Sequence, residues 1–351
     1  MHRAVFTAVK NTNPHKKDGK YITDEFISVL IYRIVSEFIE FYKLYKKDYN
    51  EFIICLDDHS KPYWRKAIYF DYKAQRKSQR EEAEVNYNEI FKHIDILISV
   101  LKNYTNFRVI GVPGVEADDI IGLLTRKYAR FEKILILSPD KDFKQLHSLG
   151  QIRQYSSLTN KWVIPDDVEE WKLEHICCGD SADNVPRIVD FLEFSPLFKD
   201  FLELRNLRLT ESEYFDIPEN SKAELVAEFR ELHPSERTHI KPRFGVTNVR
   251  KNISVFGSLD AWLDSNPLLR KTYEMNKKLV IDDCVPAKVE ADILREYTTP
   301  RNQIDLKKLK TYFDYYDLSN SCLSLFSDLI QHEVQIADWS EKRADFDNIL
   351  I

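Results

Sequence analysis

Apolar positions along the chain recur with two different spacings. Residues 23–47 and 84–102 carry apolar side chains at helical spacing, which predicts an amphipathic helix over each segment. Short continuous apolar runs cover about 51–57, 107–112 and 133–138, and such runs are typical of strands buried on both faces of a parallel sheet. The pattern therefore predicts that helices and buried strands alternate.

The order of the elements indicates the fold class. Further helices are predicted over about 116–130 and 142–148, followed by a strand pair near 151–155 and 161–164. Because strands and helices alternate, we expect an α/β fold with a Rossmann-like parallel sheet flanked by helices. From about residue 166 the sequence favours a mainly helical structure.

Composition narrows the class of protein. Of the 351 residues, 43% are hydrophobic and 13% are aromatic, which is enough for a core and excludes a disordered protein. Only 8 residues are glycine, and no glycine-rich nucleotide loop is present. The 5 cysteines include no C-x-x-C pair, and no apolar stretch reaches membrane-spanning length. We therefore expect a cytoplasmic protein with reduced thiols and no structural zinc.

Charge is unevenly distributed along the chain. The net charge of −6, taken alone, argues against a nucleic-acid-binding protein. Residues 61–80, however, contain seven Lys or Arg residues interleaved with aromatic ones, and on a helix Lys73 and Arg76 would share a face. Basic groups bind phosphates and aromatic rings stack on bases, so this segment is a candidate nucleic-acid contact. A solvated helix with extended basic side chains is the alternative.

Acidic residues follow the apolar runs. The carboxyl ends of parallel strands share one edge of a sheet, and carboxylates gathered there would repel one another unless cations held them. Hard divalent cations such as Mg²⁺ take oxygen ligands, so the pattern predicts a metal site and phosphate chemistry. A helix cap or a turn would explain each cluster taken alone. The acidic residues are Asp57, Glu116, Asp118, Asp119, Asp140, Asp142, Asp180 and Asp183.

The ordered motifs resemble the flap endonuclease/5′-3′ exonuclease family, and within it the phage ribonuclease H branch. The resemblance is good over about 50–185 and loose over 240–300. The motifs that carry it are Leu56-Asp57, Tyr63-Trp64-Arg65, Lys73-x-x-Arg76, Glu116-Ala117-Asp118-Asp119, Ser138-Pro139-Asp140-Lys141-Asp142-Phe143 and Gly179-Asp180-x-x-Asp183-Asn184.

The resemblance implies a domain organisation and a cofactor. The PIN-like catalytic domain would cover 1–185, with a helical gateway over 61–88. A helical duplex-DNA-binding domain would cover 186–330, with an insertion at 189–240, and a tail would cover 331–351. Two Mg²⁺ ions are implied, for which Mn²⁺ could substitute. The first ion would be held by Asp57, Glu116, Asp118 and Asp140, and the second by Asp119, Asp142, Asp180 and Asp183.

Basic and aromatic residues also acquire roles from the resemblance. Lys73, Arg76 and Arg65 would act as catalytic residues on the scissile phosphate, and Tyr72 and Lys77 would bind nucleic acid beside them. A helix-hairpin-helix would grip the duplex, although Thr247 replaces the second glycine of the usual hairpin. Its residues would be Gly245, Thr247, Arg250 and Lys251.

The implied activity is that of a 5′-3′ exonuclease or flap endonuclease. Its substrates would be DNA and RNA–DNA hybrids with 5′ ends or flaps, and its role would be the removal of primers or flaps in phage DNA replication. The resemblance further implies a monomer in the host cytoplasm without membrane contact. Single-strand-binding protein or a sliding clamp are the expected partners.

One departure concerns the start of the chain. The family opens with an apolar strand that ends in a metal-binding aspartate, whereas no acidic residue precedes Asp18 here. We expect the native protein to carry further residues upstream of Met1 that end in this aspartate. A family member that binds nucleic acid without cleaving it is one alternative. A small-molecule phosphatase that uses Asp140 and Asp142 is another.

Overall fold

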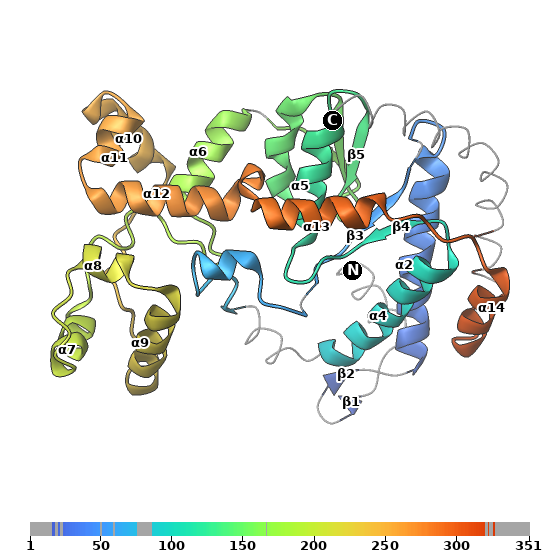
Figure 1. Cartoon of the computed structure of the whole chain (residues 1–351), viewed down its shortest axis with the longest axis horizontal. Coiled ribbons are helices and arrows are strands. Elements are labelled where there is room, and N and C mark those ends of the chain that lie inside the picture. The colour runs from blue at the N-terminus through green and yellow to red at the C-terminus, as the bar shows by residue number, and fades with distance from the viewer. Residues whose placement is uncertain are drawn as a thin grey trace. The chain divides into compact units, whose positions relative to one another are not determined.

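The computed structural model divides into two compact units, whose elements are labelled in Figure 1. The first unit comprises residues 1–56, 80–110 and 294–351, and the second comprises 57–79 and 111–293. The predicted division at residues 185 and 186 stays a prediction. The residues described are 16–17, 20–21, 24–49, 51–58, 60–75, 86–165, 167–319, 322 and 326.

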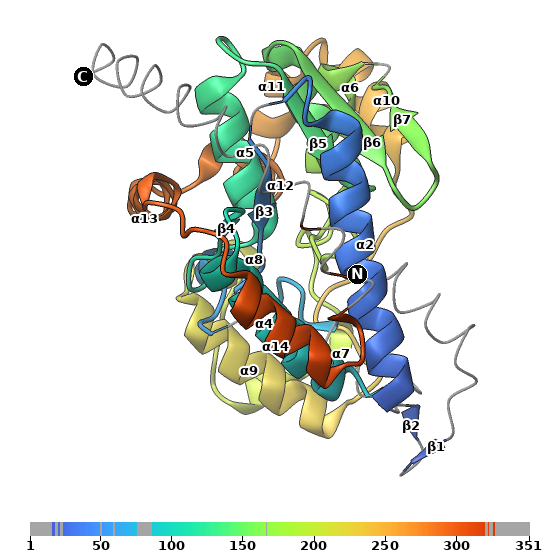
Figure 2. The same ribbon diagram turned by 90° about the vertical axis from the view of Figure 1, so that its right-hand side faces the viewer.

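Helices packed around a pair of parallel strands form the core of the first unit. Phe26, Leu30 and Ile34 are buried at helical spacing on one side of the first long helix, as the periodicity predicts. Figure 2 shows the helices of residues 24–45, 87–104 and 306–315 together, and the second contacts both of the others. The strands pair in parallel, with Ile53 opposite Arg108. The elements of this unit are β1 (Lys16–Lys17), β2 (Lys20–Tyr21), α2 (Asp24–Tyr45), β3 (Ile53–Cys55), α4 (Tyr87–Tyr104), β4 (Arg108–Ile110) and α14 (Leu306–Tyr315).

A three-stranded ladder organises the start of the second unit. The strand β5 (Ile134–Leu137) runs parallel to β6 (Ile152–Ser156), and β6 pairs antiparallel with β7 (Lys161–Val163). The helix α5 (Ala117–Tyr128) precedes β5, and the 3₁₀ segment η2 (Lys141–Leu149) connects β5 to β6. Among the described residues, the strands of the two units form separate hydrogen-bonded ladders.

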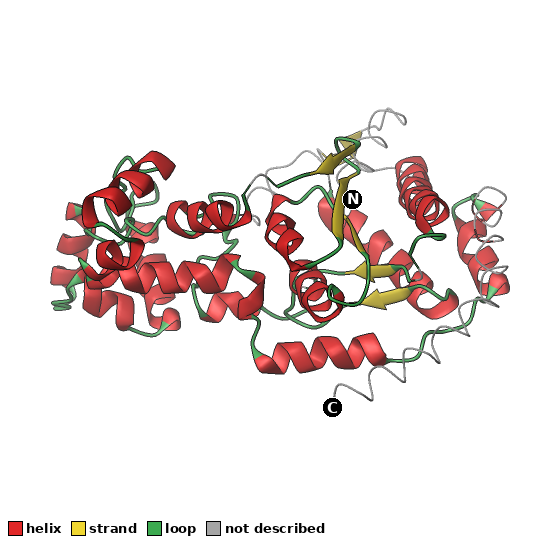
Figure 3. Cartoon of the chain, turned by 90° about the horizontal axis from the view of Figure 1, so that it is seen from above, coloured by secondary structure: helices red, strands yellow, loops and turns green. Residues whose placement is uncertain are grey.

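After β7 the second unit is helical (Figure 3), as the sequence predicts from about residue 166. Among the described residues, none of the helices combines the length and apolar character needed to cross a membrane. The remaining elements are η1 (Trp64–Ala67), α6 (Val168–Cys178), α7 (Pro196–Leu204), α8 (Glu211–Asp216), α9 (Glu219–Leu232), α10 (Val246–Phe256), α11 (Leu259–Asp264), α12 (Pro267–Val280), η3 (Asp282–Cys284) and α13 (Ala287–Thr298), which ends in the first unit.

The parallel strands and flanking helices predicted from the sequence are confirmed, with element ends that differ by a few residues. The basic segment differs from its prediction. Within 60–75 it contains one short 3₁₀ helix, η1, followed by turns. Lys73 has a φ of 55°, which an α-helix does not allow, so the helical face expected for Lys73 and Arg76 is not formed at Lys73. Arg76 lies outside the described residues, as do residues 1–15 at the start of the chain.

Candidate active site

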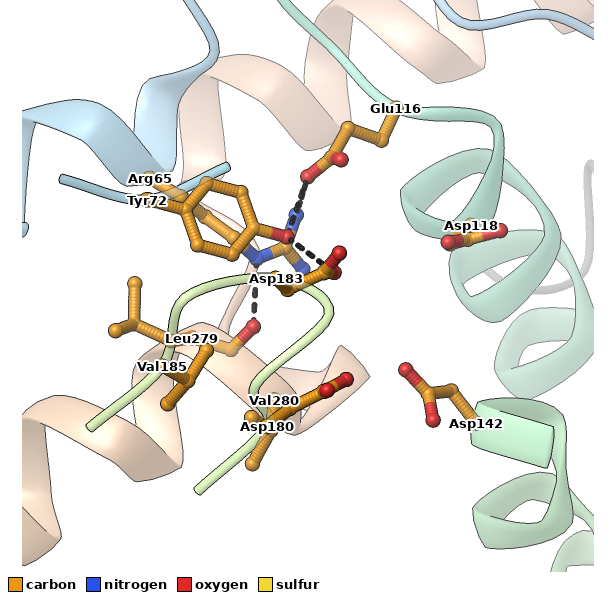
Figure 4. A pocket seen from close by; sticks show the side chains of 10 residues that line it. All are labelled: Arg65, Tyr72, Glu116, Asp118, Asp142, Asp180, Asp183, Val185, Leu279 and Val280. Carbon is orange, nitrogen blue, oxygen red and sulfur yellow. Dashed lines mark hydrogen bonds and ion pairs between the residues drawn. The ribbon is translucent and has the colours of Figure 1, made fainter. Parts of the chain in front are cut away.

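Acidic residues from three segments of the second unit meet in one pocket, which is open to solvent (Figure 4). Glu116 and Asp118 come from the start of α5, Asp142 from the first turn of η2, and Asp180 and Asp183 from the loop after α6. Arg65 and Tyr72 line the same pocket, together with the apolar residues Val185, Leu279 and Val280. The sequence prediction that the acidic clusters converge is therefore confirmed for these five carboxylates.

The strand end before Asp142 is fixed by hydrogen bonds. Asp140 caps η2, because its Oδ1 accepts a hydrogen bond of 3.0 Å from the backbone N–H of Asp142. The amide of Gln154 donates to the carbonyl oxygens of Ser138 and Asp140, at 3.0 and 2.5 Å. Gln154 is 1% exposed on the neighbouring strand β6, so it ties the loop to the sheet. This anchoring holds Asp142 at the pocket.

The loop that carries Asp180 and Asp183 requires a glycine at its start. Gly179 has a φ of 67°, and a Cβ atom there would lie 2.4 Å from the carbonyl oxygen of Val185. Backbone hydrogen bonds between Asp180 and Val185 then close the loop, at 2.7 and 3.1 Å. The closed loop aims Asp183 at the residues of the basic segment.

A buried ion cluster forms one side of the site. Arg65, which is 3% exposed, contacts Glu116 and Asp119 through its Nη1 and Nη2 atoms, both at 2.8 Å. Its Nε donates to the carbonyl oxygen of Leu279 at 2.9 Å. Burial alone would lower the pKa of Arg65, but the charge of Asp119, with Tyr72 and Glu116, raises it above its usual range. This guanidinium is therefore a permanent positive charge.

Asp119 is enclosed by this cluster and is fully buried. Its Oδ2 accepts from the indole Nε1 of Trp64 at 3.0 Å and from the backbone N–H of Glu116 at 3.2 Å. The second of these bonds closes a capping box at the start of α5. Asp119 is not among the residues that line the pocket.

Lys73 and Tyr72 bridge the two acidic segments. The ammonium group of Lys73 forms an ion pair with Glu116 and a second with Asp183, the latter at 3.2 Å. The hydroxyl of Tyr72 donates to Glu116 at 3.1 Å and to Asp183 at 3.4 Å. Burial and then the charge of Glu116 raise the pKa of Tyr72 above its usual range, so it stays a neutral donor.

The other side of the pocket holds carboxylates whose charge is not balanced to the same degree. Burial, and then the charges of Asp140, Asp180 and Asp183, raise the pKa of Asp142 to about 7. Burial followed by the charge of Asp140 raises the pKa of Asp118 well above its usual range, with Glu116 and Asp57 adding to the effect. Negative charge has thus accumulated at this side of the pocket.

The chemistry of these oxygen donors fits a hard divalent cation, since repelling carboxylates are the partners such ions prefer. Within the described part of the chain, no three acidic, His or Cys side chains are already close enough together to enclose an ion. The donor set therefore fits a cation in its chemistry, and the side chains would have to draw together around it.

Comparisons with known proteins find a matching family model, similar proteins and similar structures. The family described as 5′-3′ exonuclease, N-terminal resolvase-like domain, matches residues 1–172. Residues 1–172 are therefore similar to this exonuclease domain. The ribonuclease H of Enterobacteria phage T4 is 32% identical over 192 residues, which is 49% of this chain and 63% of that protein. The 5′-3′ exonuclease of Buchnera aphidicola (subspecies Schizaphis graminum) is 30% identical over 173 residues, which is 46% of this chain and 57% of that protein.

The chain thus spans less than two thirds of the length of these relatives. Among solved structures, it is similar to that of the T5 D15 protein co-crystallized with metal ions. The TM-score is 0.48 and the identity 15%, and the match covers 85% of this chain and 96% of that one.

The other residues predicted for a 5′-3′ exonuclease site lie at its margin or outside the description. Asp57 and Asp140 are exposed and do not line the pocket, although both carry charge that acts on Asp118. The Oδ1 of Asp57 accepts from the backbone N–H of Ala117 at 2.9 Å. Arg76 and Lys77 lie outside the described residues.

The residues predicted for the helix-hairpin-helix lie at α10. Gly245 is its N-cap and Thr247 is in its first turn. Arg250 is exposed and forms ion pairs with Glu170 and, at 3.1 Å, with Glu174 of α6. Their contact with duplex DNA, like that of Lys251, stays a prediction.

Sequence reasoning missed part of the site. The carbonyl oxygen of Leu279 holds Arg65 across more than two hundred positions of sequence, and a backbone acceptor leaves no signal in residue type. Trp64 was noted as a motif residue, and its tie to Asp119 emerged only from the structure. Gln154 belongs to none of the motifs identified in the sequence.

Proposed function

We propose that the chain is a divalent-metal-dependent 5′-nuclease that hydrolyses phosphodiester bonds in DNA and RNA–DNA hybrids with 5′ ends or flaps. The observation that carries the proposal is the two-sided pocket. Carboxylates with raised pKa values, Asp118 and Asp142, share it with the permanent cation of Arg65. Carboxylates that can hold a metal ion, beside a fixed positive charge, form a site suited to phosphodiester hydrolysis.

The proposed ligands follow the electrostatic grouping. Asp57, Glu116 and Asp140 act on Asp118 and would form the first set with it, and Asp180 and Asp183 act on Asp142 and would form the second. Asp140 also acts on Asp142, so its charge links the two sets. Asp119 was predicted to bind the second ion. Its burial and its contacts with Arg65 and Trp64 support a different role, in holding the start of α5 and Arg65 in place.

Bound Mg²⁺ or Mn²⁺ would polarise the scissile phosphate and ease deprotonation of the attacking water. The chain's own groups would place the substrate. Lys73 and Arg65 offer positive charge to a phosphate, and the charge of a phosphate oxygen grows in the transition state. Tyr72, kept neutral, can donate a hydrogen bond beside them.

The names of the relatives support the substrate class. One curated relative is a ribonuclease H and another a 5′-3′ exonuclease, so we assign nucleic acid with a 5′ end as substrate, including the RNA strand of a hybrid. Removal of RNA primers or 5′ flaps during phage DNA replication is the role that we propose.

Cleavage of an end-labelled 5′-flap duplex and of an RNA–DNA hybrid tests the proposal. We expect cleavage with Mg²⁺ or Mn²⁺ and none with EDTA, and Asp142→Asn should lower the rate by about 100-fold or more while DNA binding persists. Asp167→Asn is the matched control, because Asp167 caps α6 and does not line the pocket.

Duplex binding without metal-dependent cleavage would contradict the nuclease proposal. It would favour a nucleic-acid-binding protein that does not cleave. The open arrangement of the carboxylates, with Glu116 already paired with Lys73 and Arg65, is the observation in favour of that second function.

A further inference from the structure

Residues 191–240, within the insertion predicted over 189–240, form a small helical subdomain with its own core. Phe194, Phe198, Phe201, Tyr214 and Phe229 are buried against one another. In Figure 1 the helices α7, α8 and α9 form a group of their own, and α8 contacts α12. This packing makes the segment a folded body, not a loose loop.

The two ends of this subdomain meet. Phe194 and His239 form an antiparallel bridge, flanked by backbone hydrogen bonds of 2.9 Å from Ser195 to Thr238 and from Ile240 to Glu193. A segment that is closed at its own base can move or be removed as one piece. Any effect of this subdomain on the site must therefore pass through its contacts with the rest of the second unit.

One set of contacts reaches the residues directly before Lys73. Arg230, on α9, donates to the two carboxylate oxygens of Asp71 from its Nη1 and Nη2 atoms, at 3.2 and 2.7 Å. Glu219, at the start of α9, accepts from the backbone N–H of Phe70 at 3.1 Å. A bidentate contact between an arginine and a carboxylate fixes their orientation as well as their distance. The subdomain thus grips the chain at two successive residues.

Apolar packing supports the same grip. Phe191, at the start of the subdomain, and Phe215, on α8, pack against the cluster that contains Tyr72. Phe191 meets the ring of Tyr69 edge-on at 6.2 Å. From the other direction, the amide of Asn184 donates to the carbonyl oxygen of Asp71 at 2.8 Å. The turn before Lys73 is held on both sides.

The contacts at Phe70 and Asp71 help to hold the unusual backbone conformation of Lys73. Lys73 has a φ of 55°, a region that residues other than glycine visit at a cost, so its surroundings must hold it there. Its backbone N–H donates to the carbonyl oxygen of Asp183 at 2.9 Å, and its ammonium group reaches Glu116 and Asp183. A shift of Asp71 would displace Tyr72 and Lys73 from these partners.

We propose that the subdomain of residues 191–240 is a clamp that positions Lys73 and Tyr72 in the active site, and that Arg230 and Glu219 are its positioning residues. The clamp acts through Asp71 and Phe70 and touches no reacting atom. This assignment rests on the proposed nuclease function for its catalytic consequence. The physical clamp itself can be tested without any activity.

Hydrogen exchange followed by mass spectrometry on the full chain tests the clamp directly. In Arg230→Gln, the amides of residues 69–75 should exchange at least severalfold faster than in the wild type. Arg205→Gln is the matched control, since it breaks another arginine–carboxylate pair of the subdomain, between Arg205 at the end of α7 and Glu228 on α9. Equal exchange in Arg230→Gln and Arg205→Gln would overturn the clamp, whether or not the protein cleaves DNA.

Kinetics on the 5′-flap substrate test its consequence. Small displacements of a positioned group cost rate more than binding, so Arg230→Gln should lower kcat by about 10-fold and change KM little. Arg230→Lys, which keeps the charge, should recover part of the loss. In a Lys73→Ala background, Arg230→Gln should lower kcat by much less than 10-fold, because only the positioning of Tyr72 is left to lose. A full additional loss in that background would overturn positioning through Lys73.

Folding and function can be separated in this experiment. Arg230 is half exposed, whereas Asp71 is 8% exposed, so Arg230→Gln leaves a mostly buried carboxylate without its cation. Asp71→Asn breaks the same ion pair without leaving that charge behind, and it should give the same faster exchange. Absence of cleavage by the wild type would contradict the nuclease proposal alone, because the exchange comparison would still decide the clamp.

Discussion

The two sides of the pocket use the same residue type for opposite purposes. Around Arg65, the carboxylates of Glu116 and Asp119 are buried and paired with positive charge. Across the pocket, Asp118 and Asp142 face other carboxylates, and their pKa values are raised. Carboxylates that are paired with positive charge stabilise the fold, whereas carboxylates that repel one another favour the binding of a cation. An acidic residue in a candidate metal site should therefore be judged by its partners.

Removal of Asp119 should give the largest effect on stability. In Asp119→Ala the buried guanidinium of Arg65 loses a partner, and the free energy of unfolding should fall by about 3–5 kcal/mol. Urea unfolding in EDTA measures this, with Asp142→Asn as the comparison from the other side of the pocket. Asp142→Asn should be neutral or stabilising at neutral pH, since it removes a repelling charge. If Asp119→Ala and Asp142→Asn lowered the free energy of unfolding equally, the two sides of the pocket would not differ in charge balance.

Divalent cations should stabilise the folded chain through the unbalanced side. At a Mg²⁺ concentration about 100 times the dissociation constant, the expected gain is about 2.7 kcal/mol. Thermal unfolding with and without Mg²⁺ measures it. Asp142→Asn should lose most of this gain, and the control Asp167→Asn should keep it. A gain that survives in Asp142→Asn would place the cation elsewhere.

The smallest expected effect is a pH dependence of stability without metal. Because the pKa of Asp142 is raised to about 7, the folded chain keeps a proton that the unfolded chain loses near pH 4. The free energy of unfolding should therefore fall as the pH rises from about 4 to about 7, by about 1–2 kcal/mol after solvent screening.

Urea unfolding in EDTA at several pH values checks this slope, which Asp142→Asn should flatten. A wild-type slope of the opposite sign would show that the carboxylates on this side are balanced after all.

Much of the fold was predictable because local sequence carries it. The helices α2 and α4 and the strands β3, β4 and β5 follow from periodicity and apolar runs, which report burial directly. The basic segment was not predicted correctly around Lys73. There, the backbone follows a hydrogen bond to Asp183, more than a hundred positions away, and not local helix propensity.

For the site, the sequence predicted which residues carry charge, and for the most part where they gather. It did not distinguish the neighbours Asp118 and Asp119, since a helix turns about 100° per residue and sends them to different faces. Which face meets Arg65 depends on packing. The sequence did not predict the Asp71–Arg230 pair either. Only the packing of α9 brings these two residues together.

The sequence by itself determined the order of elements, the similarity of residues 1–172 to the N-terminal domain of 5′-3′ exonucleases, and the set of carboxylates. These depend on residue type and short-range spacing, which the chain carries in every conformation. Only the tertiary structure decided which carboxylates are neutralised by Arg65 and Lys73, and which are left to repel one another. Charge balance depends on distances between segments far apart in the chain, and those distances exist only after folding.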